Sequence, residues 1–468
     1  MRRAPVRAVA LAAGRPDPAA LALVLVPVAV VASAIALGAP PRLLAAALAA
    51  LLGLIVSAPR VRAFGFEGAW LIACVASILV GEISAISFGG QSGKILWADV
   101  LLGAGIVVQL LAPRPLEVPR APFLGAAIPF LVWSAIALPL ARDPLTGIAE
   151  LKEWVVAGAA GACALHWATD RRRARVLLGA VALTGAALAL LMAFVALHAP
   201  EGFALAVLTK NVDLPWGRNN YLAGMLALAL PLALGLMGSA RRWQKRLLWL
   251  AVVLINALGL AASASKGAIL AVALASTAAF LGPMAKGSAR LPRLALLLVF
   301  ALGAFLFVMG PLRVALDYRL QASALDYSGS ERLLLYKLAL AEGLKHPLLG
   351  IGLNNFSVVA HSLHGVDTVP HNLELGFFSE LGIPGLLMVL AWVLVLLRSA
   401  LAAIRASRSA GERSLALGCG AAVLGAVLHN QVESTLYGEQ FKLLLFVLAA
   451  AIWRLARTPH EPAAASAA

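Results

Sequence analysis

The residues best suited to chemistry lie in one polar interval, Gly310 to Leu381, of a chain that is otherwise apolar almost from end to end. Within it, His371 follows Pro370 and precedes Asn372. A neutral imidazole, with an ordinary pKa of about 6.5, can take a proton from an attacking hydroxyl at working pH. His371 is therefore a candidate general base, although a histidine in a loop is more often structural or simply solvated.

Three basic residues could hold a phosphorylated substrate near this base. Arg332 lies in the first turn of a helix predicted from Ser330, its N-cap, to Lys345. Arg218 and Lys266 each stand at the mouth of an apolar run. Arginine makes two parallel hydrogen bonds to a phosphate, and the helix that Lys266 opens could add N–H donors. Snorkelling to lipid phosphate explains each cation equally well if the fold keeps them apart.

Further polar residues are expected near these candidates. Four of them are supporting site residues: Asn219, Arg319, Asn372 and Glu374. The segment from Asn430 to Gln440 is expected on the same face, and it carries Glu433, Tyr437 and Glu439.

The composition requires that these residues be positioned by membrane helices. Hydrophobic residues make up 62% of the 468, charged residues 13%, and the mean hydropathy is +0.91. Apolar runs of about 20 residues are the length of a membrane-spanning helix. The sequence predicts an all-α polytopic membrane protein with 12 to 14 spans, chosen from 19–38, 43–57, 69–87, 95–112, 121–140, 154–169, 176–198, 221–238, 247–263, 267–284, 294–311, 382–397, 414–430 and 441–456.

Charge sets the predicted orientation. Most basic residues fall in alternate connections between the spans, which is the positive-inside pattern. Both termini are therefore expected in the cytoplasm and the polar interval outside it. The net charge of +16 is explained by this pattern, so no nucleic-acid partner is expected. The predicted parts are N-terminal spans over 1–209, spans with basic turns over 210–311, an external loop over 312–381, C-terminal spans over 382–458 and a disordered tail over 459–468.

No cofactor or metal is expected. Cys74, Cys163 and Cys419 are far apart within apolar runs, which is typical of small buried hydrophobes. His361 and His364 are three residues apart, but no third ligand has suitable spacing.

Several short motifs, taken in order, resemble the O-antigen ligase and polymerase superfamily. They are Gly217-Arg218-Asn219-Asn220, Ser265-Lys266-Gly267, Gly329-Ser330-Glu331-Arg332, the stretch from His346 to Phe356, Pro370-His371-Asn372 and Glu380-Leu381-Gly382-Ile383-Pro384-Gly385. Together they cover about residues 210–390. The family more often has Ser-Arg where this chain has Ser265-Lys266.

The resemblance implies a GT-C-like glycosyltransferase of the bacterial inner membrane with a periplasmic active site. Such an enzyme takes a glycan from undecaprenyl pyrophosphate. A ligase passes it to lipid A-core, as in lipopolysaccharide biosynthesis, and a polymerase passes it to a second lipid-linked glycan. By resemblance, His371 is the base, Arg218 and Arg332 hold the pyrophosphate, and Lys266 is a further contact.

Two alternatives remain open at this point. Motif order favours the ligase narrowly over the polymerase. A polytopic transporter or lipid flippase would instead carry ionisable groups in the middle of the membrane, and Glu82 and Asp99 lie inside early predicted spans.

Overall fold

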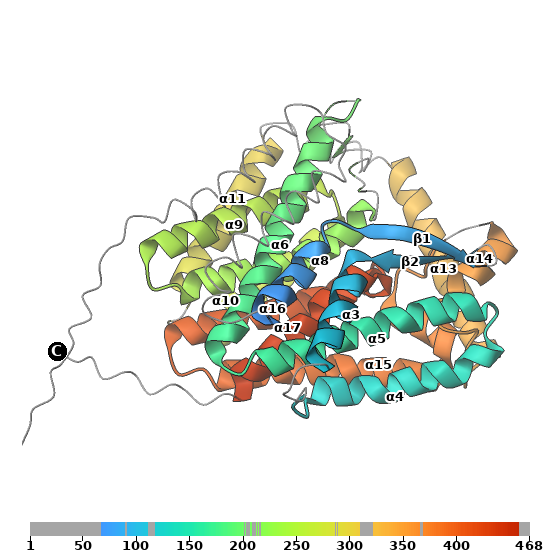
Figure 1. Ribbon diagram of the computed structural model, residues 1–468. Helices are drawn as coiled ribbons and strands as arrows, with labels where there is room; N and C mark the ends of the chain where they lie inside the picture. Colours follow the sequence, from blue (N-terminus) through green and yellow to red (C-terminus); the bar gives the residue numbers. More distant parts are fainter. Residues whose placement is uncertain are drawn as a thin grey trace, which may run out of the picture.

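The computed structural model describes residues 67–88, 91–110, 118–200, 217–285, 289–308, 322–365 and 368–457, together with Gly202, Ala206, Val207, Val212, Leu214 and Gly287. Within this part the chain is a helical bundle, as predicted (Figure 1). A helix over Glu67–Ser77 is followed by two antiparallel strands, β1 (Glu82–Phe88) and β2 (Gln91–Leu96). The spans predicted at 19–38 and 43–57, the tail at 459–468 and Arg319 lie outside the described residues.

The remaining elements follow the predicted spans closely. In chain order they are α3 (Trp97–Leu110), α4 (Pro122–Ala137), η1 (Leu138–Leu140), α5 (Pro144–Trp167), α6 (Arg171–Leu197), α8 (Asn219–Ser239), α9 (Trp243–Ala262), α10 (Lys266–Leu281), η2 (Pro283–Ala285), α11 (Arg290–Val308), α13 (Ala322–Lys345), α14 (Phe356–His364), α15 (Leu373–Arg405), α16 (Ala410–His429), η3 (Thr435–Tyr437) and α17 (Glu439–Arg457). Every span predicted from residue 95 onward falls on one of these helices.

The long helices have the character of membrane spans. Six helical segments of the described part are long and apolar enough to cross a bilayer: Pro122–Leu140, α6, α8, α9, α15 and α16. Large apolar side chains point outward from α4, α9, α10 and α15, as a lipid environment permits. The protein is therefore a multi-pass membrane protein.

Two helices form the centre of the bundle. Almost every residue of α8 and of α17 is buried. α8 packs against α6, α9, α10 and α16, and α17 packs against α5, α6 and α15. α8 and α16 cross closely at two glycines, because a Cβ on Gly418 would lie 2.8 Å from Gly235 Cα and 2.6 Å from Pro231 O. Small residues of this kind let membrane helices approach until their backbones touch.

One end of the bundle carries the polar interval. In Figure 1, α13 and α14 lie beyond the same end of α4, α5 and α15. α15 is interrupted at Gly382, whose φ of 68° and ψ of −166° are not helical. The stretch from Pro347 to Gly352 packs against this interruption: Ile351 and Gly352 donate to the carbonyls of Ser379 and Glu380, and Ile383 donates to Pro347. We call this end of the bundle the site end.

Gly350 and Gly352 have positive φ, as their sequence context allowed. A Cβ at Gly350 would lie 2.1 Å from the carbonyl carbon of Glu380, so the close approach needs a glycine. The motif from His346 to Phe356 is therefore structural in this chain: it closes the break in α15.

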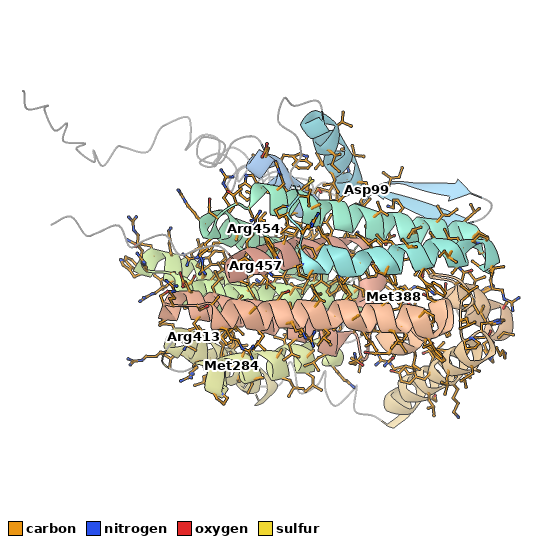
Figure 2. All side chains as sticks on the ribbon, turned by 90° about the horizontal axis from the view of Figure 1, so that it is seen from below. Asp99, Met284, Met388, Arg413, Arg454 and Arg457 are labelled. Carbon is orange, nitrogen blue, oxygen red and sulfur yellow. The ribbon has the colours of Figure 1, made fainter. Side chains whose placement is uncertain are left out.

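Basic residues gather at the opposite end. Figure 2 labels Arg413, Arg454 and Arg457, which lie toward the end of the bundle away from α13. Arg241 and Arg242 join α8 to α9 at that end, since α8 runs away from the site end.

Two sequence predictions were wrong in detail. The span predicted at 69–87 ends as a helix at Ser77, and β1 follows it. The cause lies in residues 82–88, where Ile83, Ile86 and Phe88 favour a strand and Gly89-Gly90 follows as a turn signal. The helix predicted from Ser330 begins eight residues earlier, at Ala322, so Ser330 lies inside it and is no N-cap. Its end at Lys345, before His346-Pro347, is as predicted.

Candidate functional site

His371 lies in a tightly held turn at the start of α15. Its φ of 53° is uncommon for a residue with a side chain and needs support from its surroundings. Asn372 supplies it, because its Oδ1 caps α15 by accepting from Leu375 N at 2.9 Å and its Nδ2 donates to Gln431 O at 3.2 Å. Leu373 N also donates to Asn430 O. The turn that carries His371 is thus fastened to the turn that follows α16.

The centre of the site is Glu433, in the turn after α16. Its Oε2 lies 3.0 Å from His371 Nδ1, and its Oε1 accepts from Arg332 Nη2 at 2.7 Å. The same Oε1 accepts from Asn220 Nδ2 at 2.6 Å. The Glu433 cluster, defined as Glu433, His371, Arg332 and Asn220, therefore draws side chains from α8, α13 and the turns before α15 and after α16.

The charges of the cluster favour an ionised carboxylate. Burial alone would raise the pKa of Glu433, but the hydrogen bond and charge of His371 and the charges of Arg332 and His429 outweigh it, so the pKa lies below its ordinary value. Burial raises the pKa of Tyr336, and its hydroxyl donates to His371 O at 3.4 Å. A permanent negative charge thus faces one nitrogen of the imidazole.

The other nitrogen of His371 faces away from Glu433. His371 Nε2 lies 3.2 Å from the hydroxyl of Thr368, and the side chain of His371 is 25% exposed. A carboxylate accepts from an imidazole N–H, so it selects the tautomer with its proton on Nδ1. That tautomer leaves a lone pair on Nε2, which is the arrangement of a general base.

Arg218 and Lys266 stand at the starts of two helices at the site end. Arg218 is the exposed residue before α8, two positions from Asn220 of the Glu433 cluster. Lys266 is the exposed first residue of α10. A Cβ on the next residue, Gly267, would lie 2.5 Å from Val432 Cγ2, so the start of α10 lies directly against the turn of Glu433. Neither cation takes part in the hydrogen bonds of the cluster itself.

The supporting residues have separate positions. Asn219 is buried in the first turn of α8. Glu374 accepts from Gln431 Nε2 at 2.9 Å, so it holds the turn before Glu433. Arg319 lies outside the described residues. In the described part, no three His, Cys, Asp or Glu side chains form a metal-binding group.

Glu433 is the member of the site that sequence reasoning missed. The segment from Asn430 to Gln440 was expected on the same face as His371, but none of its residues was assigned to the site. No sequence pattern marks Glu433, because its partners Arg332 and His371 are 101 and 62 residues away in the chain.

An apolar cavity of about 410 Å³ opens beside Lys266. Side chains of α8, α9, α10 and α11 line it, among them Leu230, Leu258, Val272 and Phe300. Lys266 is the charged residue of this lining. A cavity of this kind suits a hydrocarbon chain whose charged headgroup lies at the site end.

Comparison with known proteins gives one family match, over part of the chain. Residues 251–390 match the family described as O-Antigen ligase. This match supports the O-antigen ligase and polymerase superfamily, which the motifs predicted. The matched residues include Lys266, Arg332 and His371, whereas Arg218 and Glu433 lie outside them. None of the curated proteins compared with the chain matches it.

Proposed function

We propose that this chain is a glycosyltransferase of the bacterial inner membrane that moves a polysaccharide from undecaprenyl pyrophosphate to an acceptor hydroxyl. Its acceptor is lipid A-core, which makes it an O-antigen ligase of lipopolysaccharide biosynthesis. The observation that carries the proposal is the shared carboxylate of Glu433, which holds His371 and Arg332 at 3.0 and 2.7 Å. This shared carboxylate supports the proposed pairing of a base, His371, with a phosphate-binding cation, Arg332.

The reaction is a displacement with inversion at the anomeric carbon. His371 keeps its Nδ1 proton in the hydrogen bond to Glu433 and takes the proton of the acceptor hydroxyl on Nε2, and the Glu433 carboxylate stabilises the imidazolium that forms. The acceptor oxygen forms the new glycosidic bond while the bond from the anomeric carbon to the pyrophosphate oxygen breaks. The Thr368 hydroxyl, 3.2 Å from Nε2, stands at the distance from which an acceptor hydroxyl would donate.

Cations stabilise the leaving group in this proposal. Negative charge grows on the pyrophosphate as the bond breaks, and fixed donors aimed at it lower the barrier. Arg332 is held by Glu433 with its side chain 31% exposed, so part of the guanidinium remains accessible. Arg218 and Lys266, at the starts of α8 and α10, supply two further charges. The cavity beside Lys266 takes the polyprenyl chain.

Charge distribution supports a periplasmic site. The basic connections lie at the end of the bundle away from α13, and basic connections are retained in the cytoplasm. We accordingly place both termini in the cytoplasm, residues 312–381 in the periplasm, and 12 to 14 spans around them. The resulting GT-C-like arrangement puts the cluster at the outer boundary of the membrane, where a lipid-borne pyrophosphate lies.

The polymerase remains the alternative with the same chemistry. It would use the same base and cations and differ in its acceptor, a second lipid-linked glycan. The experiment below distinguishes the two by supplying each acceptor alone.

Charged residues inside the bundle are the evidence for the transporter alternative. Lys442, wholly buried on α17, pairs with Glu150 and Glu153 of α5. Lys152 likewise pairs with Asp99 and Glu439.

These pairs lie near the site end and not at mid-membrane. α5 begins at Pro144, and the preceding Arg142 donates to Ile351 at the site end. Glu150 is six residues further on, about 9 Å at 1.5 Å per residue. Charged residues that are paired with one another close to one face suit a scaffold better than alternating access.

The test is glycan transfer by the purified chain in liposomes. Lipid-linked glycan is supplied with lipid A-core in one reaction and with a second lipid-linked glycan in another. We expect transfer to lipid A-core, and a loss of about 10²–10⁴-fold in His371→Ala, the usual contribution of a general base. His364→Ala, which alters an exposed histidine of α14, is the matched control and should keep the parental rate.

Transfer only to the second lipid-linked glycan would assign the chain as a polymerase. A His371→Ala variant with the parental rate would remove the base from the mechanism. Movement of lipid across the bilayer without glycan transfer would favour the transporter.

A further inference from the structure

α13 presents three different faces. Leu335, Leu338 and Glu342 are buried against the rest of the protein. Arg332 and Tyr336, one turn apart, form the edge that faces His371. The third face lies opposite the buried one, and it is apolar.

The apolar face consists of exposed leucines at helical spacing. Leu333, Leu340 and Leu344 are 53%, 46% and 65% exposed, and the intervals of seven and four residues place them on one side of the helix. Leu348, in the turn after α13, is 67% exposed. We call these four residues the leucine face. A row of leucines with this exposure is unusual against water and marks a contact surface.

The leucine face continues the lipid-facing surface of α15. Ile383, Leu387 and Leu394 are 47%, 58% and 45% exposed along that span. The first of them is joined to the end of the leucine face, because Ile383 N donates to Pro347 O at 2.8 Å and a Cβ on Gly382 would lie 2.5 Å from Leu348 O. One apolar surface therefore runs from the span onto α13.

Two exposed lysines accompany the leucine face. Lys337, four residues after Leu333 and three before Leu340, lies on the same side of the helix and is exposed. Lys345 is 61% exposed and pairs with Glu342 at 2.6 Å. Long basic side chains of this kind reach phosphate groups while their stems lie along apolar surface. Exposed leucines on one side of a helix, with lysines whose stems lie along them, are typical of a helix that lies in the membrane interface.

We propose that α13 lies in the leaflet at the site end, with the leucine face among the lipid chains and Lys337 and Lys345 at lipid phosphates. The helix crosses the end of the spans, in keeping with its course in Figure 1. The bilayer thereby fixes the height of Arg332 and Tyr336 relative to lipid phosphates. This inference depends on the membrane location of the spans and not on the proposed reaction.

The test measures the depth of single labelled positions in the full chain, reconstituted in phosphatidylcholine liposomes with one third phosphatidylglycerol. Leu340→Cys is labelled with an environment-sensitive fluorophore. Leu387→Cys on α15 is the control for a lipid-facing position, and His364→Cys on α14 is the control for a water-facing one. Quenching by nitroxide on lipid chains is compared with quenching by aqueous iodide. The background fluorescence is measured on the unaltered chain after the same labelling, since its Cys74, Cys163 and Cys419 are all buried.

We expect Leu340→Cys to resemble Leu387→Cys, with strong quenching by lipid nitroxide and weak quenching by iodide. Leu344→Cys, on the same face, should give the same result. Strong iodide quenching at both positions, as at His364→Cys, would overturn the proposal. Protection from both quenchers would also overturn it, because a protein surface, such as a second copy of the chain, would then cover the leucine face.

Discussion

Glu433→Gln is the most informative change to the site. Glutamine has the shape of glutamate, so the packing of the turn is kept, but the negative charge is lost and one acceptor oxygen becomes a donor. His371 Nδ1, Arg332 Nη2 and Asn220 Nδ2 all point at this carboxylate. The variant therefore tests whether the charge of Glu433 holds His371 in the tautomer that a general base needs.

The expected loss of transfer rate follows from the removal of one charge-assisted hydrogen bond, that between His371 and Glu433. Such a bond contributes about 1.5–3 kcal/mol, and about 1.4 kcal/mol corresponds to tenfold in rate, so the bond from His371 accounts for about 10- to 100-fold. That is less than the loss expected for His371→Ala, since the imidazole itself remains. The assay is single-turnover glycan transfer in liposomes at saturating donor, which reports the chemical step.

Glu374→Gln is the matched control. It alters a second carboxylate at the same end of the bundle, which accepts its hydrogen bond from Gln431. Its rate should stay within about twofold of the parent, the range of a change away from the reacting groups. A parental rate in Glu433→Gln, or an equal loss in both variants, would refute the reasoning, and a shared fall in melting temperature would trace the loss to folding.

Three further predictions concern the substrate site and its stability. Lys266→Arg should lower the KM for the lipid-linked donor with kcat unchanged, because the guanidinium can bind a phosphate through two parallel bonds; an unchanged or higher KM would contradict it. Ala273→Trp, which narrows the apolar cavity, should raise that KM and leave kcat within about twofold, and a normal KM would place the polyprenyl chain elsewhere. Because the folded-state pKa of Glu433 is lowered, the stability it contributes is complete above its ordinary value of 4.5 and is lost as pH falls through the lower folded-state pKa. The difference in melting temperature between the parent and Glu433→Gln should therefore shrink below about pH 4.5, and a constant difference from pH 7 to pH 3 would argue against an ionised Glu433 in the fold.

The spans could be predicted because the bilayer imposes a single demand. A helix must stay apolar for about 20 residues to cross, and that signal is independent of what the helix packs against. The strands β1 and β2 were not predicted because Glu82–Phe88 is apolar on average, and only its β-branched and aromatic residues and the following Gly89-Gly90 distinguish it from a span. The start of α13 was misplaced because Ser330 has the side chain of an N-cap, yet the helix continues through it.

The site was predictable in its individual residues but not in its centre. His371 and Arg332 belong to ordered motifs, which made them recognisable. Glu433 is 62 residues beyond His371, in a turn that follows a different helix. An acidic side chain in a short turn has no distinguishing pattern, and its partners are set by three-dimensional packing that single-sequence periodicity does not record.

Glu433 meets Asn220 because α8 and α16 pack at one particular axial position relative to each other. α8 begins at the site end and α16 finishes there, so the two run in opposite directions, and their backbones are in close contact at Gly235 and Gly418. Sixteen residues separate Gly235 from Asn219 at the start of α8, about 24 Å of helix. A shift of either helix by one turn would displace the Glu433 carboxylate from the Asn220 amide by about 5.4 Å and break their hydrogen bond. Glycines deep in the spans therefore decide the geometry of a site that they do not touch, and for this reason the catalytic turns can be short and still hold their side chains in place.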